Sequence, residues 1–185
     1  MKTTPKTLGA DLRALRKARG ITLIDLAAAL DRSVGWLSQV ERDISVPSIA
    51  DLNTMATILD TTLASLVQTD ADPADDGIIV RANARRPMRN GTKGLTEGLL
   101  SPDLTDSFEV IHSRFEPGSQ LATPLQRDTQ EIGYVISGQL NIWVNDVHYT
   151  LSAGDSFRLR GEMYRWENQG KTPCEMIWVI SPPVY

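Results

Sequence analysis

Sulfur and imidazole ligands are scarce in this sequence of 185 residues. It holds one cysteine, Cys174, and two histidines, His112 and His148. A single cysteine excludes an internal disulfide and a metal site built from several thiolates, and it agrees with a reducing compartment. Neutral imidazoles supply most of the affinity of transition-metal sites in proteins, so two histidines leave little material for such a site.

Long apolar runs are missing as well. No stretch approaches the length of a membrane span, and the first residues, MKTTPKTLGADL, contain no apolar segment of a signal peptide. With 41% hydrophobic residues the chain can still form a packed core. We therefore expect a soluble protein of one or two domains in the cytoplasm, with no membrane partner.

The chain also lacks an excess of positive charge, since its formal net charge is −4. The charge is unevenly distributed: residues 1–68 carry 8 Lys and Arg against 7 Asp and Glu, whereas residues 69–185 carry 11 against 16. Within the first 20 residues Asp11 stands alone against six basic side chains: Lys2, Lys6, Arg13, Arg16, Lys17 and Arg19. A polyanionic partner is therefore expected to meet the N-terminal end.

The first 68 residues have the apolar periodicity of short helices. The first predicted helix ends at Gly20, a residue type that commonly follows a helix C-terminus. Side chains that can cap further helices follow at Thr22, Ser33 and Ser48. With a short last helix around Leu63, the sequence predicts a bundle of five helices.

The segment DRSVGWLSQVERD, residues 31–43, predicts a helix with two different faces. Val34, Leu37 and Val40 recur with helical spacing and predict a buried face. The remaining positions are small or polar and include one aromatic ring: Gly35, Trp36, Ser38, Gln39, Glu41 and Arg42. We expect this second face to contact a partner.

The texture of the sequence changes after residue 68. Residues 69–76, TDADPADD, are acidic and contain proline, which is typical of an interdomain linker. Short β-rich runs follow, separated by turn residues, as in an antiparallel sandwich or barrel. They are GIIVRAN, FEVIHSRF, EIGYVISG, QLNIWVN, HYTLSAGD and CEMIWVIS. The predicted fold class is multidomain α and β, with a five-helix domain over 1–68, a linker over 69–76 and an antiparallel β-barrel over 77–185.

Residues 8–68 resemble the lambda-repressor-like, or XRE-type, helix-turn-helix DNA-binding domain. The resemblance rests on the glycine after the first helix, on DLAAAL, on SxxxLSQVER and on the PSxxxL that follows, all at linked spacing. It implies that the helix of residues 33–39 enters the major groove of double-stranded DNA. The implied DNA-binding residues are Ser33, Gly35, Trp36, Ser38, Gln39 and Arg42.

The resemblance also implies a role for each side chain of that helix. Gln39 is the expected base reader, because its amide can donate to N7 and accept from the N6 amino group of adenine. Ser38 and Arg42 are better placed for phosphates. Arg16 and Glu41 occupy positions that form an internal salt bridge in this family, so we do not expect them to contact DNA.

Gly35 allows a close approach of the helix to DNA, and Trp36 can pack on sugar or on a thymine methyl group.

Two positions depart from the pattern of the XRE-type domain. Leu23 replaces a glutamine that often reaches a phosphate, and Asp43 lies in a loop that is often basic. Both changes remove phosphate contacts and are expected to lower affinity. A helical interaction module that no longer binds DNA therefore remains an alternative.

Residues 108–181 resemble a cupin, a small β-barrel. The resemblance rests on Glu131 with Gly138 after six intervening residues, and on Gly154 and Asp155, which open the second motif. A cupin behind an XRE-type domain is typical of bacterial regulators whose barrel senses a metabolite, including repressors of polyamine and sulfur-compound use. The resemblance thus implies a sensor and dimerisation domain.

The metal ligands of a cupin are largely replaced in this chain. Metal-binding cupins use two histidines in His-x-His, a glutamate and a further histidine. The corresponding positions are Pro124, Gln126, Glu131 and either Tyr164 or Arg165. A lone carboxylate with an amide holds a transition metal poorly. We therefore expect a metal-free barrel without a cofactor.

Three polar side chains are expected to converge where the metal would lie, because their positions point inward in the parent fold: Gln126, Glu131 and Tyr164. Such a group in a cavity can bind a small polar effector, and an amine or amino acid suits Glu131 best. Alternatively, Glu131 makes only structural hydrogen bonds and the barrel only dimerises. His148 is expected to face solvent, and His112 to be a core or rim residue.

These features together favour a ligand-responsive transcription regulator, a repressor that binds a pseudo-palindromic operator as a homodimer. We do not expect an enzyme, because the metal ligands are missing and no nucleophile–base pair replaces them. Two alternatives remain open. One is a cupin-type metalloenzyme with an attached targeting domain, and the other is an architectural dimer with a ligand-free barrel.

Overall fold

The computed structural model describes most of the chain, namely residues 7–67, 78–88 and 91–184. The predicted linker, residues 69–76, lies outside the described residues. The predicted limits of the two domains therefore stay predictions.

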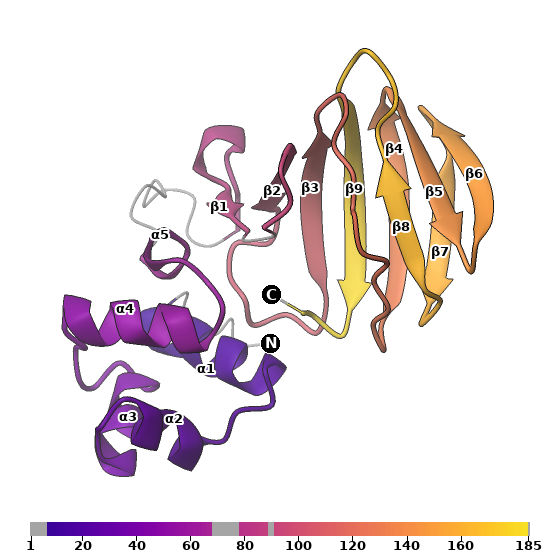
Figure 1. The fold of residues 1–185 in the computed structure, drawn as a ribbon. Coiled ribbons are helices and arrows are strands. Elements are labelled where there is room, and N and C mark those ends of the chain that lie inside the picture. Colours follow the sequence, from indigo (N-terminus) through magenta and orange to yellow (C-terminus); the bar gives the residue numbers. More distant parts are fainter. Residues whose placement is uncertain (1–6, 68–77, 89–90, 185) are drawn as a thin grey trace. The chain divides into compact units, whose positions relative to one another are not determined.

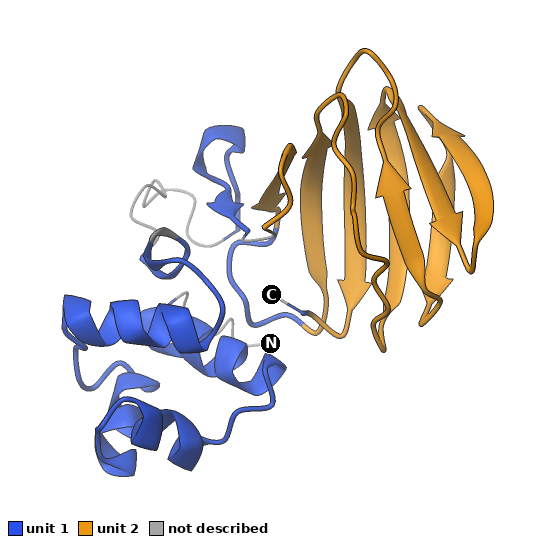
Figure 2. Ribbon diagram, viewed as in Figure 1, with its two compact units in different colours: residues 1–89, 101–106, 184–185 blue, residues 90–100, 107–183 orange. Residues whose placement is uncertain are grey.

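The chain divides into two compact units, drawn in different colours in Figure 2. The first unit contains the helices together with two short later segments, and the second contains the sheets. Their residues are 1–89, 101–106 and 184–185 in the first unit, and 90–100 and 107–183 in the second.

Five α-helices lie in the described part of the first unit (Figure 1). Their bounds are α1 Leu8–Ala18, α2 Leu23–Ala29, α3 Val34–Val40, α4 Ile49–Ile58 and α5 Leu63–Leu66. The predicted caps are confirmed, because the hydroxyls of Thr22, Ser33 and Ser48 each accept a hydrogen bond from a backbone N–H of the first helical turn. Gly20 has the positive φ of 65° that suits a residue just past the end of α1.

The helices pack around one apolar core. Its fully buried members are Leu12, Leu15, Leu26, Leu37, Val40, Met55 and Leu59. The prediction for α3 is wrong at one position, because Val34 is 41% exposed. Val34 is the first residue of α3, and its side chain lies at the edge of the helical bundle, outside the core.

The chain after the predicted linker begins with less strand than expected. The GIIVRAN segment was predicted as a strand, but its described residues lead into the 3₁₀ helix η2, Ala82–Ala84. Ile78 and Ile79 are both exposed, so this apolar run packs into no sheet. The two-residue strand β1, Arg86–Pro87, closes this part of the first unit.

The second unit is built from antiparallel strands in two sheets. One sheet has the order β2-β3-β9-β4-β7 and the other the order β6-β5-β8. The bounds are β2 Leu95–Leu99, β3 Glu109–Phe115, β4 Gln130–Ser137, β5 Gln139–Val144, β6 Val147–Ser152, β7 Ser156–Arg160, β8 Tyr164–Glu167 and β9 Cys174–Ser181. The antiparallel cupin-type fold is confirmed, with its described strands divided between two sheets and not joined in one closed hydrogen-bonded barrel.

Strand alternation decides which side chains enter the space between the sheets. β3 and β9 pair along their whole length, and every second residue of each is buried. Ile111, Trp178 and Ile180 therefore face inward. Glu131 of β4 lies opposite Ile180 and also faces inward, as do the buried Glu109 and Ser113 of β3, so polar side chains enter the interior between apolar ones.

Candidate functional site

The start of α3 is open to solvent. Ser33 Oγ accepts a hydrogen bond of 3.1 Å from the Trp36 N–H, which fixes the first turn of the helix. Gly35 is exposed, and a Cβ at this position would meet only Ser33 Oγ, 4.0 Å away. The backbone at this end of α3 can therefore approach a partner closely, but the glycine is not required by packing within the unit.

Gln39 lies exposed on α3 and has a partner that the sequence reading missed. Its side-chain oxygen accepts a hydrogen bond of 2.8 Å from the Ser45 hydroxyl. Ser45 thereby orients the amide and leaves its NH₂ group available as a donor. The hydroxyl at a position six residues beyond Gln39 was the only sequence signal for this contact.

Trp36 is half-buried, and its ring contacts Arg32, a partner that the sequence did not predict. The guanidinium of Arg32 lies 5.1 Å from the centre of the Trp36 ring, within the range of a cation–π contact. Arg32 also makes two hydrogen bonds to Asp51, of 3.1 and 3.2 Å. The Trp36 ring is thus held against the unit, and a positive charge lies at the entry to α3.

The two residues expected to contact phosphates, Ser38 and Arg42, lie at the C-terminal end of α3. Arg42 is exposed, and its Nε donates to the Ser38 carbonyl at 3.0 Å. The other nitrogens of this guanidinium have no partner among the described residues. Ser38 is half-buried, so it is less accessible than Arg42.

A buried ion pair anchors α3 to α1. Arg16 donates to both carboxylate oxygens of Glu41, at 2.5 and 2.9 Å, and only about a tenth or less of either side chain is exposed. The hydrogen bond to Glu41 is the main cause that raises the pKa of Arg16. The predicted internal role of this pair is confirmed.

A second contact between α1 and the end of α3 explains Asp43. The Asp43 carboxylate accepts a hydrogen bond of 2.9 Å from the Gly9 N–H. A Cβ on Gly9 would lie 2.3 Å from the Val40 carbonyl oxygen, so the two backbones approach too closely for any other residue. Asp43 therefore orients α3 within the unit.

In the second unit, Glu131 is enclosed by hydrogen-bond donors. It is 2% exposed. Thr129 donates its hydroxyl proton to one carboxylate oxygen at 2.6 Å, and the Trp178 indole N–H donates to the other at 2.7 Å. Among the residues that the structure describes, Glu131 forms no ion pair with a basic side chain. The site thus holds a buried carboxylate with hydrogen bonds but without a paired cation.

Tyr164 lies beside Glu131, as predicted. It is 5% exposed, and burial raises the pKa of its phenol well above the ordinary value, with the Glu131 carboxylate adding to the rise. The phenol is therefore protonated at neutral pH. The centre of its ring lies 5.7 Å from that of Trp178 with the two planes tilted by 34°, and Trp178 itself meets Phe157 edge-to-face at 5.1 Å.

Gln126 does not join this group. It is exposed, and its amide NH₂ donates to the Gly161 carbonyl at 2.8 Å. The structure thus brings Glu131 and Tyr164 together, with Thr129 and Trp178 in place of Gln126.

The donors at this site do not fit the metal that many cupins hold. Proline offers no donor atom, a protonated phenol is a poor ligand, and both oxygens of Glu131 accept hydrogen bonds. Among the described residues no three His, Cys, Asp or Glu side chains gather as a possible metal site. The residues at this site therefore do not fit a transition-metal ion.

The two histidines lie away from the interior. His112 has a hydrogen-bond partner, as expected, because its Nε2 lies 3.3 Å from Glu175, but it is half-buried on the outer face of the larger sheet and not in the core. His148 is exposed, as predicted, and its ring lies 4.7 Å from that of Trp143.

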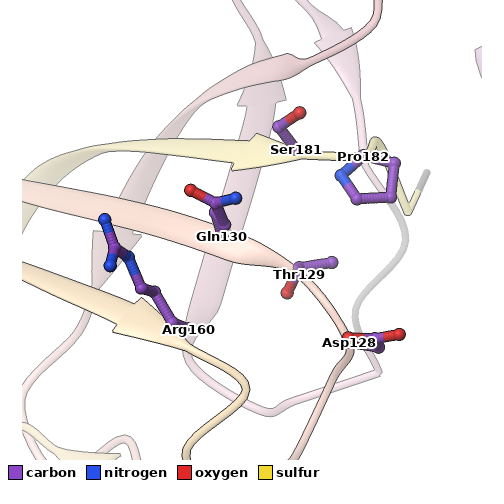
Figure 3. Close-up of a pocket in the computed structure, with 6 residues that line it drawn as sticks. All are labelled: Asp128, Thr129, Gln130, Arg160, Ser181 and Pro182. Carbon is purple, nitrogen blue, oxygen red and sulfur yellow. The ribbon is translucent and has the colours of Figure 1, made fainter.

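A polar pocket of about 470 Å³ lies on the outer face of the larger sheet, because Gln130, Arg160 and Ser181 are exposed cross-strand neighbours on the face opposite to Glu131. Figure 3 shows its lining at the start of β4, the end of β7 and the end of β9. The lining residues are Asp128, Thr129, Gln130, Arg160, Ser181 and Pro182. Thr129 lines this pocket and also donates to Glu131, but the pocket and the Glu131 carboxylate lie on opposite faces of the sheet.

Comparison with known proteins gives the same two parts. A family model described as a helix-turn-helix domain matches residues 7–67, and one described as a cupin domain matches residues 111–180. The chain is similar to the HTH-type transcriptional regulator PuuR of Escherichia coli (strain K12), with 21% identity over 96% of each chain. It is also similar to the HTH-type transcriptional regulator SutR of the same organism, with 25% identity over 99% of each chain.

One solved structure supports the fold of the second unit. The polyketide cyclase RemF from Streptomyces resistomycificus has a TM-score of 0.50 and 20% identity, over 56% of this chain and 78% of that one. This likeness shows the cupin fold alone.

The fold and the matches define a DNA-binding transcription regulator. The chain carries a helix-turn-helix domain followed by a cupin domain, and over nearly its whole length it is similar to HTH-type transcriptional regulators. None of the helices in the described residues is long and apolar enough to cross a membrane.

Proposed function

We propose that this protein is a transcriptional repressor that is not an enzyme and whose cupin unit senses a small polar metabolite. It binds a pseudo-palindromic operator as a homodimer and acts in the cytoplasm. The DNA contacts of each copy are Ser33, Gly35, Trp36, Ser38, Gln39 and Arg42. The effector contacts are Glu131 and Tyr164.

The observation that carries the sensing role is the buried carboxylate of Glu131. Burying an ionised carboxylate is costly unless it is paired or well hydrogen-bonded. Here two neutral donors from Thr129 and Trp178 stabilise it, and no basic side chain of the described chain forms an ion pair with it. An ammonium group would supply the missing positive charge, so the proposed effector class is amines and amino acids.

The DNA-binding role is supported by the exposed polar face of α3. The helix buries Leu37 and Val40, and it leaves Gln39 and Arg42 accessible. A single small helix-turn-helix contacts few base pairs, and symmetric dimers of such units read two half-sites. A homodimer therefore accounts best for sequence-specific binding by this unit.

A second candidate is a cupin unit that holds no ligand and only dimerises the protein. One specific observation favours it: both carboxylate oxygens of Glu131 already accept hydrogen bonds. In that case Glu131 fixes Thr129 and Trp178 in place and has no further role.

A ligand screen separates the two candidates. Thermal unfolding is followed with a panel of primary amines, diamines and amino acids, and with carboxylic acids of the same carbon skeletons. Under the sensing proposal at least one amine raises the melting temperature and changes operator affinity, and Glu131→Gln abolishes both effects. The matched control Glu175→Gln removes a carboxylate from the outer face and leaves both effects intact.

The same screen can also contradict the sensing proposal. If no amine or amino acid shifts unfolding of the wild-type protein, the sensing proposal fails and the ligand-free unit is correct. The repressor role is tested by a reporter gene behind the selected operator. Expression falls when the protein is present, and a rise in expression would show an activator.

A further inference from the structure

Three chain segments of the first unit continue directly into strands of the second unit. Arg86 precedes β2 in the sequence, residues 101–106 connect β2 to β3, and Val184 follows β9. All three belong to the same compact unit as the helices. Each therefore leads by covalent chain from the helical unit into a strand of the second unit.

Asp11 of α1 holds two of these connections. Its carboxylate forms an ion pair with Arg86, and the side chains are only 3% and 2% exposed. Its other oxygen accepts a hydrogen bond of 3.0 Å from the Leu104 N–H. One side chain of α1 thus binds the segments on both sides of β2.

The third connection is held at the end of the same helix. Arg19, the C-cap residue of α1, donates to the Leu59 carbonyl at 3.1 Å and also to the Val184 carbonyl. The two ends of α1 therefore contact all three segments that continue into the sheets.

The same helix also positions the recognition helix. Arg16 of α1 binds Glu41, the C-cap residue of α3, and Gly9 binds Asp43 just beyond it. A displacement of α1 would therefore be passed to the end of α3.

Stability alone does not account for a charged pair at the Asp11–Arg86 position. An apolar pair of similar volume is often as stable as a buried ion pair, or more stable. Two further nitrogens of Arg86, Nε and Nη1, are buried without a hydrogen-bond partner among the described residues. This guanidinium therefore depends on Asp11, and the contact is suited to be either fully made or broken.

We propose that Asp11 and Arg86 are positioning residues for DNA binding: they tie α1, and through Arg16 and Glu41 the helix α3, to the chain segments that lead into β2 and β3. The inference rests on the proposed sensing function, because it supplies the route by which a change in the cupin unit alters operator affinity. Coupling between sites is reciprocal, so DNA bound at α3 must also act on those segments.

Hydrogen exchange of the full-length protein tests this without any effector. The DNA is a duplex that the wild-type protein selects from a random-sequence library. In the wild type, DNA is expected to slow amide exchange in residues 101–106 and in β2 and β3 by about fivefold or more, the lower end of typical coupling. Slowing that stays within residues 7–67 would overturn the proposal.

The double variant Asp11→Asn with Arg86→Met removes both charges and retains an oxygen for the Leu104 N–H. It is expected to melt near the wild-type temperature and to confine DNA-induced protection to residues 7–67. The control, Arg114→Met with Glu175→Gln, removes an exposed ion pair of the outer sheet face and transmits like the wild type. A folded Asp11/Arg86 double variant that transmits as well as the wild type contradicts the proposal.

If that double variant does not fold, Arg86→Lys is measured in its place. Lysine keeps a positive charge near Asp11 but not the geometry of the guanidinium, so we expect DNA to slow amide exchange in β2 and β3 less than in the wild type. Unchanged slowing in β2 and β3 would contradict the inference. Failure of the sensing function gives a different pattern. In that case no amine changes operator affinity, whereas DNA-induced protection still reaches β2 and β3.

Discussion

Replacing Gln39 with alanine is the most direct perturbation of base recognition. The Gln39 amide lies exposed on α3 and is oriented by the Ser45 hydroxyl at 2.8 Å. The substitution removes the amide without removing a buried contact, so the fold of the unit is not expected to change. Any effect on DNA binding can then be assigned to recognition.

The magnitude follows from the hydrogen bonds that are made and lost. A good bidentate contact to adenine contributes about 1–3 kcal/mol of discrimination. If DNA displaces the hydrogen bond from Ser45, about 0.5–1.5 kcal/mol of that gain is offset. We therefore expect Gln39→Ala to lower specific affinity by about 1–2 kcal/mol, near the lower half of the range for such contacts.

The assay is a titration by fluorescence anisotropy against the selected duplex and against its single-base variants. Gln39→Ala should lose preference at one base position in each half-site. Arg42→Ala, the matched control, should weaken binding to all duplexes alike and reduce the slope of affinity against salt. Equal base preference in the wild type and in Gln39→Ala would refute the assignment of Gln39.

Three further predictions concern stability and composition. Glu41→Gln leaves the Arg16 charge buried without its partner and should reduce the free energy of unfolding by about 3–5 kcal/mol in urea titrations. Neutral residues at both positions should recover most of this loss. A loss below about 1 kcal/mol for the single change would contradict burial of the pair. The pKa of Asp51 is lowered, first by the Ser48 hydroxyl and then by Arg32, so its contribution to stability is present above the usual value of about 3.9 and is lost as the pH falls through the lowered pKa; Asp51→Asn should flatten that acid limb, and an unchanged limb would contradict the assignment. Elemental analysis of protein purified without chelator should find only substoichiometric iron, manganese, nickel or zinc, and one equivalent per chain would show that the cupin interior holds a metal after all.

The helix caps could be predicted because they depend on neighbours in the sequence. Thr22, Ser33 and Ser48 each bond a backbone N–H three residues later, so the determinant and its partner lie within one turn. The Arg16–Glu41 pair was also predicted, but from resemblance to a family and not from spacing. Its partners are 25 residues apart, which no local pattern reports.

The strands were harder to predict, for two physical reasons. β2, with the sequence LTEGL, contains a glycine and a glutamate, and β7, SFRLR, alternates with arginines, so neither has a strong apolar pattern. GIIVRAN shows the opposite error, because Ile78 and Ile79 have high strand propensity but no neighbouring strand to cover them. Strand formation depends on a distant partner, and these sequences do not specify one.

The candidate sites divide in the same way. Gln39 and Glu131 were identified in the sequence by their place in a motif. Their partners were not: Ser45 lies six residues beyond Gln39 in a loop whose conformation no helical pattern specifies, and Trp178 is brought to Glu131 by the tertiary fold from 47 residues away. Gln126 was expected beside Glu131 on the assumption that this part of the chain keeps the geometry of metal-binding cupins, and here its amide bonds a nearby carbonyl.

Selection of binding sites from a random duplex library shows at once whether α3 reads base sequence and whether two copies bind together. We expect strong enrichment of a pseudo-palindromic site whose half-sites are separated by about 10 base pairs, or a multiple of that spacing. With Gln39→Ala, we expect enrichment to be lost at one position of each half-site. A library that remains unenriched, or a single asymmetric site bound by one copy, would contradict sequence-specific binding by a dimer.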